Sequence, residues 1–380
     1  MNNKITSICP LLSKGKLNSW APLRLVLLSW EMLSFILSFV FLGFVSTSCN
    51  PAYQGPKSDH FDGAEFYNTE PSGHSFGDMV KWLWEMETVN WPDWIEDPLL
   101  PAPLKSIDGD SVKITFINHA TVLIQMNGVN ILTDPIWSLR AGPYSWLGTK
   151  RIRAAGVKIE DLPLINFILI SHDHYDHLDL QTLKSISKKH KPIILAGLGV
   201  KSILDNQRII NISELDWWQT YKTKNHDLKI TFVPARHNSN RGLFSGNKTL
   251  WGGFVIEGQS GQIYFAGDTA FGEFIHPIAD RFQNIRLAIL PIGSYEKRWF
   301  MKNQHMNPDD AVQVHKILNA QQSMGIHYAT FAEHPEQAVD AHEQDLAAAL
   351  EKYGVPDSEF WLLDFGEGRF VKQIKPEINH

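Results

Sequence analysis

The chain has 380 residues, 43% of them hydrophobic and 20% charged, which is the composition of a globular protein with one large domain or several smaller ones. The formal net charge is −6, but residues 1–49 contribute +3, which leaves −9 for residues 50–380. An acidic body argues against broad nucleic-acid binding, which requires Lys and Arg to neutralise phosphates. Only Cys9 and Cys49 are present, so the sequence holds neither a disulfide framework nor a thiolate-rich metal site.

Residues 1–49 have the features of a targeting segment. Basic residues precede an apolar stretch over residues 32–45, which is followed by small residues and Cys49. These are the parts of a secretory signal, and the small residues ahead of Cys49 are similar to a bacterial lipoprotein signal, in which that cysteine is lipidated. The alternative is an uncleaved membrane anchor over residues 25–45. Both interpretations predict a bacterial protein whose body lies outside the cytoplasm, at a membrane.

Residues 50–104 form an expected extension ahead of the main domain. Residues 50–75 are rich in Pro, Gly, Asn, Asp and Ser, which is typical of a linker. Four tryptophans follow between Trp82 and Trp94. They fit either an interfacial membrane patch or a helix and loop packed across the core, and we favour the packed arrangement. A second Pro-rich linker at residues 97–103 places the start of the main domain near residue 105.

Residues 105–380 alternate between strand and helix patterns. Two alternating runs flank Asn127-Gly128, a strong hairpin signal. A helix is expected over residues 308–318, because Asn307 suits its cap and Pro308 its first turn, and another over 335–353, ending at Gly354. The expected strands cover residues 112–117, 120–125, 129–133, 193–195, 229–233, 252–256, 262–265 and 287–290. Two groups of strands with helices between and after them predict an α/β sandwich of two sheets.

The densest group of polar residues is Ser171–Asp179, which reads SHDHYDHLD. It follows residues 162–170, whose apolar end predicts a buried strand, so its side chains lie where a strand ends. Imidazole nitrogens with a carboxylate oxygen suit zinc or a similar divalent ion. The potential metal ligands are His172, His174, Asp176 and His177.

Three later residues also follow expected strands: His237, Asp268 and His327. Gly267 leaves room for the backbone to approach the site. A single histidine at a strand end is more often structural than a ligand, but three such residues after SHDHYDHLD indicate a binuclear centre.

The order of these motifs resembles the metallo-β-lactamase superfamily, and within it the N-acyl-phosphatidylethanolamine-hydrolysing phospholipase D family. The resemblance runs from residue 117 to residue 369 and implies an αββα sandwich carrying two zinc ions. The motifs that carry it, besides SHDHYDHLD, are NHAT at 118–121, LTDPI at 132–136, ELDWW at 214–218, LWG at 250–252, FAGDT at 265–269 and PIGSYEKRWF at 291–300.

By this resemblance, one zinc is held by His172, His174 and His237, and the other by Asp176, His177 and His327, with Asp268 as the bridge between them. A hydroxide bridging the metals would be the nucleophile. No cysteine lies near the second position, which weakens an antibiotic-hydrolase interpretation.

The other candidate residues have open roles. Tyr175, Gln304 and His305 either contact the phosphate and the leaving group or only support the site. His119 is expected to be a buried, hydrogen-bonded histidine. Asp134 and Asp179 are candidate partners for the free ring nitrogens of the ligand histidines.

The function expected from these residues is hydrolysis of N-acyl-phosphatidylethanolamine or a related phospholipid at a membrane surface, without a nucleic-acid partner. Two alternatives remain open, a hydrolase of a small soluble substrate such as a sugar-phosphate lactone and a non-catalytic envelope binding protein. The sequence leaves the oligomeric state open, a homodimer included. Residues 238–248 differ from the family, which leaves the preferred lipid undetermined.

Overall fold

The computed structural model describes residues 53–87, 89–224, 226–242, 245–332 and 336–373, all within one compact unit, Asn50–His380. The expected signal or anchor and Cys49 lie outside the described residues. Within those described ranges, no helix combines the length and the apolar character needed to cross a bilayer.

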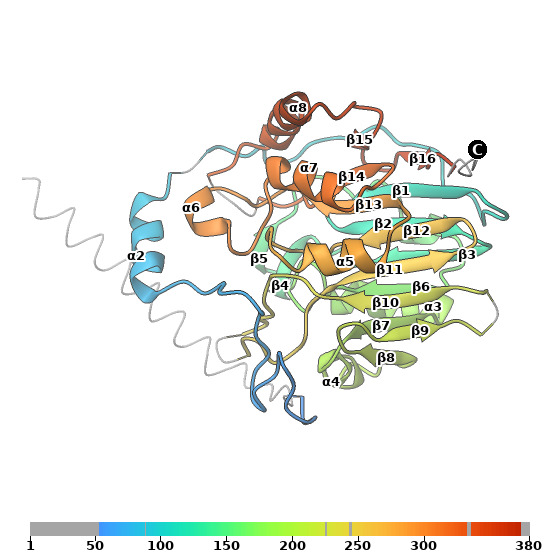
Figure 1. Ribbon diagram of the computed structural model, residues 1–380, viewed down its shortest axis with the longest axis horizontal. Coiled ribbons are helices and arrows are strands. Elements are labelled where there is room, and N and C mark those ends of the chain that lie inside the picture. Colours follow the sequence, from blue (N-terminus) through green and yellow to red (C-terminus); the bar gives the residue numbers. More distant parts are fainter. Residues whose placement is uncertain (1–52, 88, 225, 243–244, 333–335, 374–380) are drawn as a thin grey trace, which may run out of the picture. The chain divides into compact units, whose positions relative to one another are not determined.

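The first sheet has seven strands in the order β16-β1-β2-β3-β6-β7-β8 (Figure 1). Its first part is antiparallel, and β3, β6, β7 and β8 run parallel. The predicted hairpin at Asn127-Gly128 is confirmed, and both residues have a positive φ. The strands are β1 (Val112–Asn118), β2 (Thr121–Met126), β3 (Val129–Thr133), β6 (Phe167–Ile170), β7 (Ile193–Gly197), β8 (Ile212–Leu215) and β16 (Gly368–Phe370).

The second sheet also has seven strands, in the order β15-β14-β13-β12-β11-β10-β9. Strands β9 to β12 are antiparallel, and β12 to β15 run parallel. The strands are β9 (Thr220–Lys222), β10 (Lys229–Val233), β11 (Gly253–Gly258), β12 (Gly261–Phe265), β13 (Ile285–Pro291), β14 (Ser323–Ile326) and β15 (Phe360–Trp361).

Helices flank the two sheets, which confirms the αββα sandwich (Figure 1). Successive residues of a strand point to opposite faces, so Val122 and Ile124 of β2 join the core between the sheets, whereas Leu123 joins the core under α3 and α4. The helices are α2 (Phe76–Glu85), α3 (Leu180–His190), α4 (Val200–Asp205), α5 (Ile275–Arg281), α6 (Arg298–Met301), α7 (Pro308–Ile317) and α8 (Ala341–Tyr353), with a 3-10 turn at Ile159–Asp161.

Two local predictions need correction, and one hairpin is missing from the predictions. Residues 50–75 were interpreted as a linker, but Phe61 and Phe66 are 1% exposed and join the core. Helix α8 begins at Ala341, not near residue 335. A further hairpin of β4 (Arg140–Tyr144) and β5 (Leu147–Lys150) was not predicted.

The prediction that the tryptophans pack across the core is wrong in part. Helix α2 is capped by a Ser75–Asp78 capping box and buries none of its residues. Trp82 stacks on Phe300 with ring centroids 5.0 Å apart, but Trp84 is 88% exposed. The helix therefore lies on the surface of the domain and contacts it through one side.

Candidate metal centre

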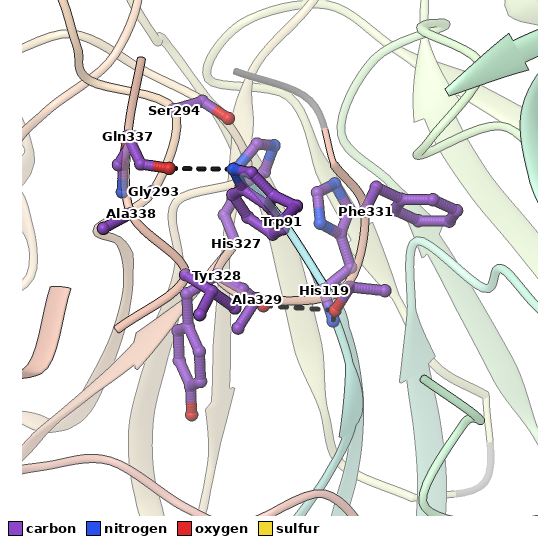
Figure 2. A pocket seen from close by; sticks show the side chains of 12 residues that line it. Trp91, His119, Gly293, Ser294, His327, Tyr328, Ala329, Phe331, Gln337 and Ala338 are labelled. Carbon is purple, nitrogen blue, oxygen red and sulfur yellow. Dashed lines mark hydrogen bonds between the residues drawn. The ribbon is translucent and has the colours of Figure 1, made fainter. Parts of the chain in front are cut away.

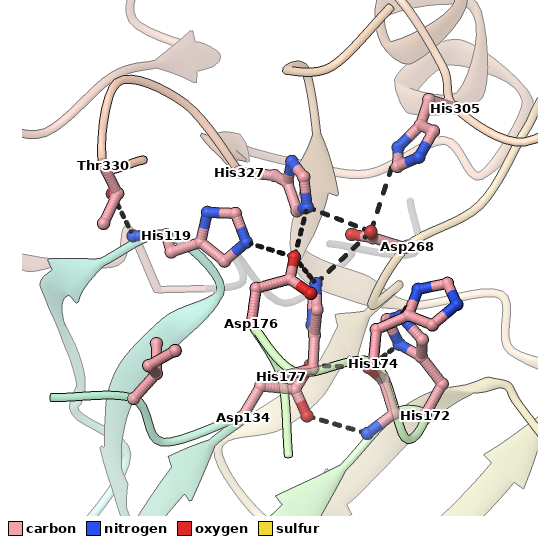
Figure 3. Close-up of polar contacts among 12 residues, drawn as sticks. His119, Asp134, His172, His174, Asp176, His177, Asp268, His305, His327 and Thr330 are labelled. Carbon is pink, nitrogen blue, oxygen red and sulfur yellow. Dashed lines mark hydrogen bonds and ion pairs between the residues drawn. The ribbon is translucent and has the colours of Figure 1, made fainter. Parts of the chain in front are cut away.

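The seven predicted ligands come together where strands of the two sheets end. Figure 3 labels six of them, all except His237. Ser171–Asp179 joins the end of β6 to α3 in the first sheet. His237, Asp268 and His327 follow β10, β12 and β14 of the second sheet. The prediction that these side chains lie at strand ends is confirmed, and each sheet supplies part of the centre.

Three histidines form the first cluster. The Nε2 atom of His172 lies 2.9 Å from Nδ1 of His174, which lies 3.3 Å from Nε2 of His237. The other ring nitrogen of each histidine has its own acceptor, namely the Ser171 hydroxyl, the Asn238 side-chain oxygen and the Gln304 carbonyl. The Ser171 hydroxyl accepts here because it donates to Asp134. Each of the three nitrogens that point inward therefore carries a free lone pair and no hydrogen.

Burial keeps two of these imidazoles neutral. Burial, then the neighbouring His177 and His174, lowers the pKa of His172 well below its usual value. Burial and His174 lower the pKa of His237 to about 3. Converging lone pairs repel one another unless a cation lies between them, and neutral imidazole is the form that binds zinc. The cluster fits a divalent ion.

The second cluster combines two carboxylates and two histidines. Nε2 of His177 lies 3.2 Å from Oδ2 of Asp176 and 3.3 Å from Oδ2 of Asp268. Nε2 of His327 lies 3.5 Å and 3.0 Å from the same two oxygens. The Nδ1–H of His177 donates to Asp134, 2.8 Å away. This set of nitrogen and oxygen donors also fits a divalent ion.

Two buried atoms of this cluster have no hydrogen-bond partner among the described residues, Nε2 of His177 and Oδ1 of Asp268. Burial opposes ionisation here, but the histidines outweigh it and hold the pKa of Asp268 and Asp176 well below the usual value. Burial also opposes protonation of His177, but the two carboxylates raise its pKa well above normal. Buried polar atoms are rarely left without partners, and a metal ion would satisfy both.

The two expected supporting aspartates have different outcomes. Asp134 supports His177 as predicted. Asp179 does not contact a ligand histidine; its carboxylate accepts from the backbone of Gln181 and Thr182 and caps α3. Asn238 and the Gln304 carbonyl were not predicted as supports. Asn238 has a signal in the sequence, since it directly follows His237, but a carbonyl group has none.

Of the three candidates with open roles, Gln304 supports His237 through its backbone carbonyl. The other two, Tyr175 and His305, lie in different surroundings. The hydroxyl of Tyr175 donates to the Arg241 carbonyl over 2.7 Å, and the Arg241 guanidinium lies 4.0 Å from its ring centre. His305 Nδ1 lies 3.8 Å from Oδ2 of Asp268. His305 therefore lies beside the candidate centre, whereas Tyr175 packs against the loop of residues 238–242.

A small cavity is lined by His119, His327 and Trp91, among other residues (Figure 2). The Trp91 indole donates to the Gln337 carbonyl over 2.9 Å. The cavity volume of about 20 Å³ accommodates roughly one water molecule. A phospholipid therefore cannot occupy it.

Comparison with known proteins agrees with this centre. A family model described as a beta-lactamase superfamily domain matches residues 129–328. N-acyl-phosphatidylethanolamine-hydrolyzing phospholipase D 1 of Caenorhabditis elegans is 38% identical over 67% of this chain and 74% of that protein. The mitochondrial N-acyl-phosphatidylethanolamine-hydrolyzing phospholipase D of Saccharomyces cerevisiae is 33% identical over 64% of this chain and 54% of that protein.

Among solved structures, Igni18, a metallo hydrolase from Ignicoccus hospitalis, matches with a TM-score of 0.52 and 21% identity, covering 69% of this chain and 99% of that one. At this identity the likeness concerns the fold alone. The family model, the relatives and the His/Asp clusters identify the chain as a metal-dependent hydrolase of the metallo-β-lactamase superfamily that resembles N-acyl-phosphatidylethanolamine-hydrolysing phospholipase D.

Proposed function

We propose that the protein is a zinc phosphodiesterase of phospholipase D type, which hydrolyses N-acyl-phosphatidylethanolamine or a related phospholipid to phosphatidic acid and N-acylethanolamine. The observation that carries this proposal is the pair of adjacent His/Asp clusters in a chain 38% identical to an enzyme named for that reaction. A pair of divalent ions supplies Lewis acidity toward a phosphoryl group and activates water for attack on it.

We assign one ion to His172, His174 and His237, and the other to Asp176, His177 and His327. Asp268 suits the bridging position because its Oδ2 lies 3.3 Å from His177 and 3.9 Å from His237, one residue of each cluster. Its Oδ1 has no hydrogen-bond partner among the described residues, so both oxygens have capacity for a metal. Zinc matches this donor set of imidazoles and carboxylates without cysteine.

His305 is the side chain to which we assign proton donation to the leaving alcohol. It lies 3.8 Å from Asp268, and its backbone carbonyl accepts from Arg298, which holds it in place beside the centre. A general acid has to lie within hydrogen-bond reach of the leaving oxygen. We assign Tyr175 a supporting role, because Arg241 contacts both its hydroxyl and its ring.

The exposed side of α2 supports a membrane surface as the partner. Its apolar residues follow helical spacing along one face and are Phe76, Met79, Val80, Leu83 and Trp84, between 49% and 88% exposed. The opposite side contacts Phe300 of α6, which leads within five residues to His305. We propose that this face inserts into the phospholipid surface that also supplies the substrate, because the apolar stretch at residues 32–45 precedes it in the chain.

We further propose that Cys49 carries the lipid that anchors the chain outside the cytoplasm. Labelled palmitate should then attach to the protein in bacterial cells, and a Cys49→Ser protein should not label. Absence of label from both proteins would contradict the lipoprotein assignment and favour an uncleaved anchor, and equal labelling of both would place the lipid on another residue.

The activity test uses the full-length protein in detergent, with bound metal measured for zinc, iron and manganese. The protein is incubated with N-acyl-phosphatidylethanolamine in mixed micelles and separately with bis(4-nitrophenyl) phosphate, and the products are followed by mass spectrometry. We expect phosphatidic acid and N-acylethanolamine. Turnover of the soluble diester alone would overturn the lipid assignment. Release of diacylglycerol would contradict the bond that is cleaved, and full metal loading without turnover of either substrate would contradict the enzyme assignment.

A further inference from the structure

His119 lies in the short connection between β1 and β2, where the strand register shifts at Phe116 and Asn118. Its φ is +48°, in the left-handed region that a residue with a side chain seldom adopts. His327 at the end of β14 has a φ of +65°. Residues held in such conformations cluster at functional sites, where the surrounding contacts fix them.

The imidazole of His119 contacts a proposed metal ligand. It is 1% exposed, and its Nε2 lies 2.9 Å from Oδ2 of Asp176. An ionised carboxylate only accepts hydrogen bonds, so the His119 nitrogen donates. The contact holds the Asp176 side chain in one orientation.

The backbone of His119 contacts a second proposed ligand. Its carbonyl accepts from the N–H of His327 over 2.9 Å. Its own N–H donates to the Thr330 hydroxyl over 2.8 Å (Figure 3). The His119 and His327 rings also lie 3.9 Å apart between centroids. A residue next to β1 of the first sheet therefore fixes the position of the loop that follows β14 of the second sheet.

The direction of approach separates His119 from the two histidines of the second cluster. Nε2 of His177 and Nε2 of His327 lie within 3.3 Å of Asp268 as well as close to Asp176. Figure 3 shows His119 on the side of Asp176 that faces away from Asp268. A donor atom of His119 lies within 4.8 Å of donor atoms of Asp176, His177 and His327, but its approach from the side away from Asp268 suits a residue that orients the ligand from outside the metal position.

We propose that His119 is a positioning residue for the second metal position, where its imidazole orients Asp176 and its backbone carbonyl fixes His327. This inference rests on the metal assignment made in the proposed function. Groups that hydrogen-bond to a ligand carboxylate fix its orientation, and their loss commonly weakens metal binding by roughly 10–100-fold. His119 is thus assigned to metal affinity and not to contact with the substrate.

Two variants isolate the side chain, because the backbone bond to His327 is retained in both. His119→Ala removes the donor to Asp176, and His119→Gln keeps an amide N–H at similar reach. His315→Ala is the matched control: His315 is 5% exposed and hydrogen-bonded to Ser323, where β14 begins, at the opposite end of that strand from His327.

The readout is metal binding by the full-length protein in detergent, stripped with a chelator and titrated with Zn²⁺ and with Co²⁺, whose visible absorption reports the ligand set. We expect two ions in the unchanged protein. In His119→Ala, one ion should bind as before and the other about 10–100-fold more weakly, with an unchanged spectrum at saturation. His119→Gln should restore most of the loss, and His315→Ala should bind both ions normally.

Unchanged affinities in His119→Ala, equal weakening at both positions, or the same loss in His315→Ala would overturn the proposal. A saturated Co²⁺ spectrum that shows one nitrogen donor fewer would make His119 a ligand, which also overturns the positioning role. Because the measurement uses no substrate, a protein that binds two ions but leaves N-acyl-phosphatidylethanolamine intact contradicts the proposed function and not this inference.

Discussion

At the scale of single residues, Asp268 lies between the two groups of histidines and is 3% exposed. Asp268→Asn replaces one carboxylate oxygen by an amide NH₂, which repels a cation, so we expect both bound metal and hydrolysis to fall at least tenfold, a loss of about 1.4 kcal/mol or more. Metal content by mass spectrometry and the rate on N-acyl-phosphatidylethanolamine check this. Asp357→Asn, at an exposed position, is the control. Normal metal and activity in Asp268→Asn would refute the bridge.

His342 gives a prediction about stability and pH. It is 3% exposed and stacks on Tyr328, with centroids 4.3 Å apart, and burial lowers its pKa to about 4. The folded protein therefore disfavours the charged imidazole, so this stabilisation is complete above pH 6.5 and declines as the pH falls toward 4, by up to about 3 kcal/mol.

We expect His342→Phe to lose less unfolding free energy than the unchanged protein between pH 7 and pH 4.5, because phenylalanine keeps the ring and does not titrate. Denaturant unfolding at several pH values measures the difference. His276→Phe, at an exposed position on α5, should leave the pH dependence unchanged. Parallel curves for His342→Phe and the unchanged protein would refute the role of His342.

The candidate ligands were predictable because strand ends are visible in the sequence as apolar runs followed by polar residues, as at His237 and Asp268. Their supports were less predictable. Asp179, the last residue of the motif, is of a type that supports ligand histidines, yet its carboxylate caps α3. The Gln304 carbonyl that holds His237 depends on where the backbone passes, and every residue has a carbonyl.

At the scale of elements, α2 shows why an apolar helical pattern is ambiguous. A stripe at helical spacing forms when a helix packs on a core and equally when it faces a lipid surface. The sequence therefore did not separate these arrangements, whereas the 88% exposure of Trp84 excludes packing of that side chain on the core. The β4–β5 hairpin was missed because Gly142 and Pro143 interrupt its alternating pattern.

The exposed stripe leads to a prediction about membrane binding. Leu83→Asp and Trp84→Asp each remove about 1.5–3 kcal/mol of apolar burial in a lipid surface, so binding to phospholipid vesicles should weaken at least tenfold. Vesicle co-sedimentation of residues 50–380, which form one compact unit and lack the apolar stretch at residues 32–45, measures this. Ile210→Asp is the control, since Ile210 is 69% exposed but lies next to β8. Undiminished binding of both α2 variants, or an equal loss in Ile210→Asp, would contradict insertion of this face.

At the scale of the whole molecule, the two-sheet sandwich follows from strands with alternating apolar residues, as in β2, where Leu123 faces one core and its neighbours the other. The strand order did not follow from the sequence, because β15 and β16 are only two and three residues long and β16 pairs with β1, far away in the chain. Such short strands exist only because a formed sheet edge pairs with them.

The metal centre joins the two sheets, since Asp176 and His177 follow β6 and His237, Asp268 and His327 follow strands of the other sheet. Without a cation, Nε2 of His177 and Oδ1 of Asp268 remain buried and have no hydrogen-bond partner among the described residues. A ligand that binds only the folded state stabilises it by RT ln(1 + [L]/Kd), about 4 kcal/mol at 1,000 times Kd. Chelation should therefore lower the thermal unfolding midpoint by several degrees, and added Zn²⁺ should restore it. Scanning calorimetry measures the shift. The midpoint of Asp268→Asn should respond little to the chelator. If the midpoint of the original protein stays the same after verified removal of the metal, the ions do not hold the sheets together.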